Sequence, residues 1–207
     1  MEDELLKRAE DLRARCERTA TVTATAFLTP AEQAAIAAWA KYRADCTLLF
    51  HGGGTDCERK AAFFLPFYLA PEDFDASEYL RAVRVTAAFG TPGHRDYLGA
   101  ILGLGIRRAW IGDILVSGST AYVFCLPSVE GHVLTLEKVG RCGVKTAPMA
   151  LADVPAPERK TKTVTFTVKS LRFDAAVAGL FGLSRTVAAE RIRAGLASLN
   201  DAECLRP

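Results

Sequence analysis

Residues 113–125 read DILVSGSTAYVFC, two runs rich in β-branched and aromatic residues on either side of a Ser-Gly turn. This pattern predicts a β-hairpin, because a short turn containing glycine reverses the chain between two strands. Outward from the hairpin, the apolar periodicity predicts four more elements: a strand near 80–88, a helix near 95–104, a helix from Pro127 and a strand near 142–147. This β-α-β-β-α-β order is that of the split βαβ, or ferredoxin-like, fold, which we expect over residues 76–151.

Two aromatic residues of this hairpin, Tyr122 and Phe124, are two positions apart and therefore share one face of the sheet. On a solvated face their rings would offer surfaces on which RNA bases stack. On a covered face they are core residues, which the sequence favours because no Lys/Arg-Gly-aromatic signature accompanies them. The topology by itself assigns no function.

Residues 1–75 predict a small N-terminal α/β domain. A helix is expected over 2–18, and a second one follows Thr29, where a Thr-Pro-Ala-Glu start supplies the N-cap, a proline at the first helical position and a glutamate three residues after the cap. Residues 47–50 (TLLF) predict a strand. Residues 56–64 (DCERKAAFF) predict a further helix that stops at Pro66.

The C-terminal part begins with a predicted linker over 152–163, which is rich in proline and charge and has no apolar period. A last domain is then expected over 164–207. Its predicted elements are a short strand over 164–168, a helix over 173–181 ended by Gly182, a helix capped by Ser184 and ended by Gly195, and a strand or turn over 196–200.

Basic side chains concentrate in this C-terminal part, although the formal net charge of the chain is only +2. Residues 159–193 carry eight basic and two acidic side chains. Clustered Lys and Arg bind phosphates with release of counterions, so the segment fits a polyanionic partner. A solvated basic face explains the charge alone equally well.

Composition and residue spacing argue against a membrane-spanning, a secreted and a metal-binding protein. The longest apolar runs are far shorter than the roughly 20 residues of a membrane span, and the N-terminus is charged rather than shaped as a signal peptide. The six cysteines lie far apart, without CxxC pairs or zinc-ligand spacing, which favours buried thiols in a reducing compartment. We therefore expect a cytoplasmic protein with no metal, no cofactor and no membrane association.

Three short motifs are similar to parts of enzyme sites but lack the necessary partners. HGGG at 51–54 has the sequence of a lipase oxyanion loop, yet no GxSxG nucleophile motif occurs in the chain. The HRD at 94–96 would need an asparagine at position 101 to form a kinase catalytic loop, and that position is Ile101. The GLG at 103–105 lacks the third glycine of a dinucleotide loop. No catalytic residue is expected.

The HRD and GLG motifs are better explained as structural. Asp96 favours the positive end of a helix that starts at His94, and the two glycines let the chain turn out of that helix. Arg107 and Arg108 would project from the turn, toward phosphate or toward solvent.

Four blocks of sequence make the chain resemble the YlmH family of bacterial RNA-binding proteins. They are FHGG with ERK (50–53 and 58–60), HRDYLGAILGLGIRR followed by IGDI (94–108 and 111–114), KVGR (138–141), and the pattern from SLRFD through LSR to Asn200 (170–200). The resemblance spans nearly the whole chain. Its last block also resembles the S4-like, or alpha-L, RNA-binding motif, which pairs two short helices.

The resemblance implies an RNA site on this helix pair, because arginine forks held at rigid helix starts fit phosphate and stack on bases. By resemblance, RNA-facing or domain-organising positions are taken by Arg172, Asp174, Ser184, Arg185 and Arg193. Charge adds Lys169, Arg191, Arg107 and Arg108 to the candidate RNA-binding residues, and Asn200 joins Asp174 as an organising residue. Because a carboxylate repels phosphate, Asp174 is expected to orient an arginine or cap the helix.

Two departures from the family pattern stand in the last block. The sequence ends at Pro207, whereas the family continues through a further hairpin, so a partial S4-like domain is expected. Phe173 stands where leucine is usual, which a core accommodates by small repacking.

The resemblance implies a monomeric, non-enzymatic protein of the bacterial cytoplasm that binds rRNA or tRNA on the large ribosomal subunit. Its expected role is ribosome-associated quality control, on obstructed subunits that carry peptidyl-tRNA, where it supports C-terminal tailing of the stalled chain. The alternatives are an RNA-modifying enzyme or accessory that uses the motif for targeting, and an adaptor linked to cell division.

Overall fold

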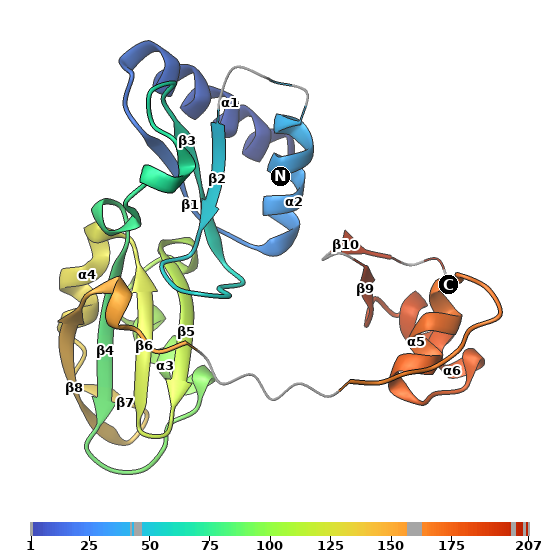
Figure 1. Cartoon of the computed structure of the whole chain (residues 1–207). Helices are drawn as coiled ribbons and strands as arrows, with labels where there is room; N and C mark the ends of the chain where they lie inside the picture. The colour runs from blue at the N-terminus through green and yellow to red at the C-terminus, as the bar shows by residue number, and fades with distance from the viewer. Residues whose placement is uncertain are drawn as a thin grey trace. The chain divides into compact units, whose positions relative to one another are not determined.

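The structure, a computed structural model, describes residues 2–41, 43, 47–156, 163–199, 202–204 and 206. The chain forms two compact units, residues 1–157 and residues 158–207, and the two are described separately (Figure 1). The domain boundary predicted at residues 75 and 76 falls inside the first unit, between its two sheets. Independent folding of the two sheets stays a prediction. Six of the twelve positions of the predicted linker, 157–162, lie outside the described residues.

The first sheet of unit 1 has three antiparallel strands in the order β1-β3-β2. Its elements are α1 (Glu2–Thr19), β1 (Thr23–Leu28), α2 (Pro30–Ala40), β2 (Thr47–His51) and β3 (Lys60–Leu65). The helix predicted over 2–18, the helix predicted after Thr29 and the strand predicted at 47–50 are confirmed, and Thr29 and Glu32 form the expected capping box. The two helices pack on the sheet through a cluster that includes Ala9, Cys16, Ile36 and Phe64.

The helix predicted over 56–64 is wrong, because residues 60–65 form the central strand β3. This strand is flanked on both edges and buried on both faces, so its residues 61–65 (AAFFL) are continuously apolar instead of alternating. A short apolar run of this kind does not distinguish a buried strand from a helix segment. Strand β1 was also not predicted from the sequence.

The second sheet of unit 1 has five antiparallel strands in the order β5-β6-β4-β8-β7. The elements are β4 (Arg81–Ala87), α3 (His94–Gly103), β5 (Ile111–Ser117), β6 (Thr120–Cys125), α4 (Pro127–Leu134), β7 (Lys138–Val139) and β8 (Cys142–Met149). Two 3-10 helices connect the sheets, η1 (Pro71–Asp73) and η2 (Ala76–Glu78). A third, η3 (Arg108–Trp110), precedes β5, and η4 (Leu151–Asp153) follows β8. The predicted element order is confirmed, and the short strand β7 is added to it.

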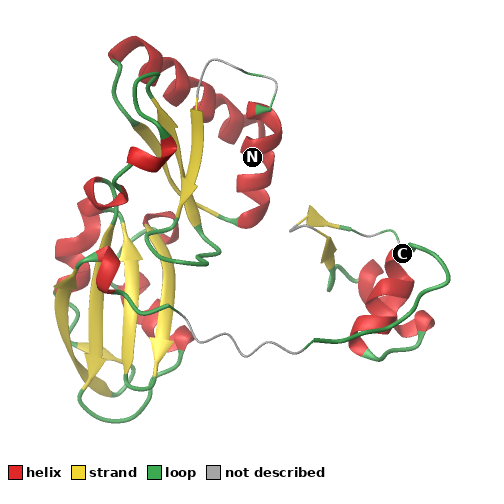
Figure 2. Cartoon of the chain, in the orientation of Figure 1, coloured by secondary structure: helices red, strands yellow, loops and turns green. Residues whose placement is uncertain are grey.

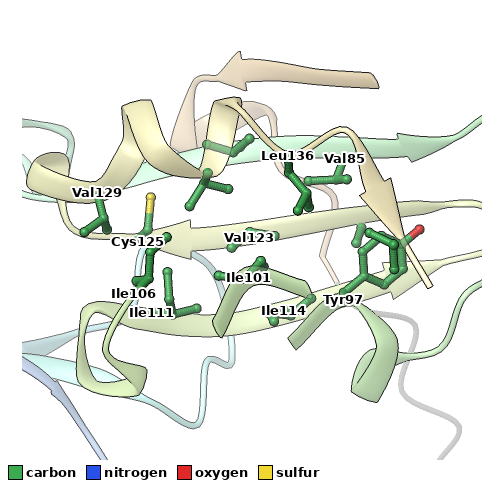
Figure 3. Packing of buried hydrophobic residues seen from close by; sticks show 14 residues of the cluster. Val85, Tyr97, Ile101, Ile106, Ile111, Ile114, Val123, Cys125, Val129 and Leu136 are labelled. Carbon is green, nitrogen blue, oxygen red and sulfur yellow. The ribbon is translucent and has the colours of Figure 1, made fainter. Parts of the chain in front are cut away.

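Helices α3 and α4 cover one face of this sheet and enclose its main core (Figure 3). Val83 and Val85 of β4 and Val123 of β6 point into this core, where Tyr97 of α3 is fully buried. The Tyr97 hydroxyl donates to the carbonyl oxygen of Ser119 at 3.1 Å, so its polar end is satisfied in the hairpin turn. This core fixes the hairpin against α3.

Among the described residues, no α-helix covers the opposite face, and the three-stranded sheet together with η4 covers one end of it. Phe124 of β6 lies in that covered end together with Phe27, Phe63 and Ala82. Phe124 has no exposed surface, which confirms its interpretation as a core residue. Tyr122, two residues earlier on the same face, is only partly buried.

The glycine loop that follows β2 packs directly on the ring of Phe124. Gly53 adopts a φ of +99°, and a Cβ there would lie 2.6 Å from Cδ1 of Phe124. The amide of Gly53 also donates to Nδ1 of His51 at 3.0 Å. The HGGG motif therefore serves close packing between the two sheets.

Gly53→Ala is expected to lower the free energy of unfolding by about 1–3 kcal/mol, because the methyl group overpacks the Phe124 site and the backbone is in a region that L-residues rarely adopt. The matched control is Gly99→Ala in α3, where an added Cβ meets no atom within 4 Å. Urea denaturation followed by circular dichroism measures both. Equal unfolding midpoints for the two variants would show that the loop tolerates a side chain.

Unit 2 is built on two short helices followed by two very short strands (Figure 2). They are α5 (Phe173–Phe181), α6 (Arg185–Arg193), β9 (Ser198–Leu199) and β10 (Ala202–Glu203), with β9 and β10 antiparallel. The helices pack through Val177, Ala178, Ala188 and Ile192. Both predicted helices are confirmed.

Two details of the prediction for this unit are wrong. Residues 164–168 are not a strand. The Phe166 ring nevertheless lies close against Gly179 of α5, where an added Cβ would lie 2.2 Å from its Cδ2 atom. The sequence predicts that the two helices pack through Ala176, Val177, Leu180, Ala188, Ala189 and Ile192, but Leu180 is 49% exposed. Val177, Ala188 and Ile192 lie in the interface as predicted, and Ala178 joins them.

Candidate nucleic-acid interface

The starts of α5 and α6 bring the arginines of unit 2 together. Arg172 occupies the N-cap position of α5 in an extended conformation. Gly182 ends α5 with a φ of +62°, a left-handed turn that glycine adopts without steric cost. Ser184 then caps α6, where its Oγ accepts from the amide of Val187 at 3.3 Å. The turn therefore places Arg185, the first residue of α6, beside the first turn of α5.

The carboxylate of Asp174 joins these two helix starts. Its Oδ1 accepts from Nε of Arg172 at 3.0 Å and from the amide of Ala175 at 2.9 Å. Its Oδ2 accepts from Arg185, from NH2 at 2.8 Å and from Nε at 3.3 Å. This is the orienting geometry that the sequence predicted for Asp174. We call Arg172, Asp174 and Arg185 the arginine clamp.

The clamp buries its carboxylate and leaves its cations accessible. The Asp174 side chain is 7% exposed, whereas the side chains of Arg172 and Arg185 are 56% and 59% exposed. Hydrogen bonds from Arg172 and then Arg185 lower the pKa of Asp174 to about 2, from an ordinary value of 3.8. The ion pairs therefore stabilise the folded unit above pH 3.8, and this contribution is lost as the pH falls toward 2.

A shallow groove of about 350 Å³ adjoins the clamp on α6. It is lined by Asp174, Arg185, Thr186, Ala189 and Arg193. Positions 185, 189 and 193 follow each other at four-residue spacing and thus share one face of the helix. Thr186 was not among the predicted site residues, although its spacing of three and seven residues to Ala189 and Arg193 places it on the same face of the helix.

The other predicted site residues are not part of this groove. Arg191 lies about 200° around α6 from Arg193, at roughly 100° per residue. Lys169 is exposed upstream of the clamp, and Asn200 lies outside the described residues.

Arg107 and Arg108 belong to unit 1 and differ from each other. Arg107 is exposed, with its guanidinium 5.2 Å from the centre of the Trp110 ring. Arg108 is partly buried, and its NH1 donates to the carbonyl oxygens of Ile111 and Gly112. Burial lowers the pKa of Arg108. Arg108 therefore has a structural role in the chain turn before β5.

Two of the sequence blocks shared with the family meet in unit 1. The carboxylate of Asp113, in IGDI, accepts from the amides of Glu58 and Arg59, in ERK, at 2.6 and 3.1 Å. This contact ties the loop before β3 to the five-stranded sheet. The Asp113 carboxylate thus links the two sheets through backbone amides.

A cavity of about 570 Å³ also lies in unit 1, beside the glycine loop. Its polar lining includes His51, Asp75 and Ser77. Burial lowers the pKa of His51, so this imidazole is neutral near pH 7. With a carboxylate and no cation among its lining residues, the cavity does not suit phosphate.

Among the described residues, no group of three or more His, Cys, Asp and Glu side chains is arranged to hold a metal ion. The same part of the chain contains no helix that combines the length and the apolar composition needed to cross a membrane.

Fold and site together define a two-unit α+β protein whose second unit presents arginines fixed by a buried carboxylate. The family described as "Putative RNA-binding domain in YlmH" matches residues 70–153, which contain the five-stranded sheet. The "Ribosome-associated protein quality control protein P2" of Bacillus subtilis (strain 168) is 32% identical over 177 residues, covering 85% of this chain and 68% of the relative. The chain therefore belongs to the YlmH family.

A solved structure gives a further likeness of fold. The "Cell division protein ylmH from Streptococcus pneumoniae" has a TM-score of 0.59 and 21% sequence identity, and the match covers 72% of this chain and 92% of that one. At this level of identity the likeness concerns the fold alone.

Proposed function

We propose that this chain is a non-enzymatic RNA-binding protein of the bacterial cytoplasm that contacts rRNA or tRNA on the large ribosomal subunit as a monomer. Its proposed role is ribosome-associated quality control, in which it binds obstructed subunits that carry peptidyl-tRNA and supports C-terminal tailing of the stalled chain. The family match to an RNA-binding domain and the printed name of the Bacillus relative support this proposal.

The arginine clamp is the observation that carries the proposal. Arg172 uses only its Nε on Asp174, and Arg185 uses Nε and one terminal nitrogen. A guanidinium has five N–H donors, so several remain on each half-exposed side chain. Two cations against one carboxylate leave a net positive charge, and forked donors of fixed orientation are what a folded phosphate backbone requires.

We also assign unit 2 to the S4-like (alpha-L) class and the five-stranded sheet to the ferredoxin-like class. Two short helices joined by a left-handed glycine turn, followed by short strands, support the first assignment. The strand order β5-β6-β4-β8 with two helices on one face supports the second.

The test is co-sedimentation of the purified chain with isolated large ribosomal subunits over a salt series, beside isolated small subunits. We expect pelleting with the large subunit that weakens steeply as salt rises, because counterion release drives phosphate binding. Equal pelleting with both subunits, or a salt-insensitive fraction, would favour a nonspecific or protein-mediated contact and would refute the proposal.

A further inference from the structure

The face of the five-stranded sheet that lies opposite α3 and α4 carries an aromatic ring and three exposed cations. The strand register places Arg84 of β4 directly opposite Tyr122 of β6 and opposite Ala147 of β8. Residues directly opposite in an antiparallel pair share a face, with Cβ atoms about 4.5–5.5 Å apart. Because Val83 and Val85 point into the helix-covered core, Arg84 and Tyr122 lie on the other face.

Two lysines extend this face toward its β7 edge. Lys145 of β8 lies opposite Thr86, and Lys138 of β7 lies opposite Gly143, so both share the face of Arg84. All three cations are exposed. None of them forms an ion pair or a side-chain hydrogen bond with another described residue.

Within the described part of the chain, one end of this face is covered. There Phe124, Ala82, Leu115 and Met149 pack with residues of the three-stranded sheet and with Leu151 and Val154, in and just after η4. Beyond it, the strand side chains on this face belong to Ser117, Thr120, Tyr122, Arg84, Thr86, Ala147, Lys145 and Lys138, and include no Asp or Glu. We call these eight residues the open face.

We propose that the open face binds an unpaired segment of RNA, with a base stacked on the Tyr122 ring and the backbone phosphates held by Arg84, Lys145 and Lys138. The inference rests on the proposed RNA-binding function and gives it a second site, in the unit that does not contain the arginine clamp.

An unpaired segment is favoured over a duplex because a base must be splayed out to stack on a ring that lies within a sheet. In a duplex the bases stack on each other, and only the phosphates would reach the face. A positively charged face with a stacking ring is the arrangement that binds single strands with little sequence preference. An acidic polypeptide would satisfy the cations but would make no use of the ring for stacking.

The experiment measures fluorescence anisotropy of a labelled single-stranded RNA of 12 nucleotides and mixed sequence, titrated with the full chain. Tyr122→Ala removes the ring and is expected to weaken binding about fivefold or more, whereas Tyr122→Phe keeps the ring and should bind as the wild type does. Arg84→Gln removes one cation and should reduce the slope of log affinity against log salt by about 0.7. Arg95→Gln is the matched control, since it removes an exposed charge from α3, on the covered side of the sheet.

The outcomes separate the face from the proposed function. The proposed RNA site on the open face is supported if Tyr122→Ala and Arg84→Gln weaken RNA binding while Tyr122→Phe and Arg95→Gln do not. If all variants bind RNA as the wild type does while the wild type pellets with large subunits, the open face is refuted and the proposed function stands. If the wild type neither binds RNA nor pellets, both are refuted. Poly-glutamate is also tested as a competitor of the labelled RNA. If it displaces that RNA as strongly as unlabelled RNA of equal charge does, the face binds an acidic polypeptide instead.

Discussion

Replacing Arg172 and Arg185 together by alanine is expected to remove most of the affinity of the chain for the large ribosomal subunit. Each guanidinium supplies charge-assisted hydrogen bonds to phosphate, which are worth about 1–3 kcal/mol per residue. The two effects should not add simply, because both side chains share the Asp174 carboxylate. The slope of log affinity against log salt should fall by about one per arginine lost.

Co-sedimentation over a salt series measures this loss. The charge-matched control is Arg15→Ala/Arg18→Ala, which removes two exposed arginines from α1. A second pair, Arg172→Lys/Arg185→Lys, keeps the charge but not the planar fork, so we expect intermediate affinity. Circular dichroism checks that the helices persist. A double alanine variant that pellets as well as its control would place the ribosome contact elsewhere in the chain.

Asp174→Asn is expected to weaken RNA binding even though it makes the chain more positive. An asparagine side chain accepts through one oxygen and presents an NH2 group on the other side, so it cannot accept at both of the positions that Arg172 and Arg185 use on Asp174. One guanidinium would face a donor, and the two helix starts would lose their common anchor. The arginines would then be free to rotate, and fixing them again on RNA costs conformational entropy.

The same substitution should also change how unit 2 responds to acid. In the wild type, the ion pairs that lower the pKa of Asp174 stabilise the folded unit above pH 3.8, and that stabilisation disappears toward pH 2. Asparagine does not titrate, so helix content of the variant should be less sensitive to pH across this window. Circular dichroism between pH 5 and pH 2 compares the two chains.

Much of the fold could be predicted because its local signals agree with its packing. The capping box at Thr29, the hairpin turn at Gly118 and the glycine that ends α5 each fix a chain direction through short-range geometry. The alternation of Val83 and Val85 with Arg84 marks a strand with one covered face. These positions obey rules that act over a few residues.

The central strand β3 escaped prediction because its environment is not encoded locally. Its burial on both faces depends on β1, β2 and the helices that pack across it, and this burial removes the alternation that identifies a strand. The exposure of Leu180 has a similar origin, since the contact stripe of two nine-residue helices is set by the angle at which they cross.

The candidate site could be predicted in its residue types but not in its geometry. The sequence indicated Arg172, Asp174 and Arg185, and it suggested that Asp174 orients an arginine. Only the structure shows that one carboxylate holds both arginines, because this depends on the left-handed turn at Gly182. For Arg108 the residue type was misleading. A basic residue in a turn was a candidate for RNA binding, but its guanidinium donates to backbone carbonyl oxygens.

The central claim is that a buried carboxylate presents the arginines to RNA, and an equilibrium titration of wild type and Asp174→Asn against isolated large ribosomal subunits at one fixed salt concentration tests it most directly. Arg191→Ala, on the far side of α6, is titrated alongside to show the effect of losing one exposed charge. If the clamp positions the arginines, Asp174→Asn binds more weakly than the wild type. If Asp174→Asn binds more tightly than the wild type, as its added positive charge alone would require, then Asp174 does not position the arginines for RNA.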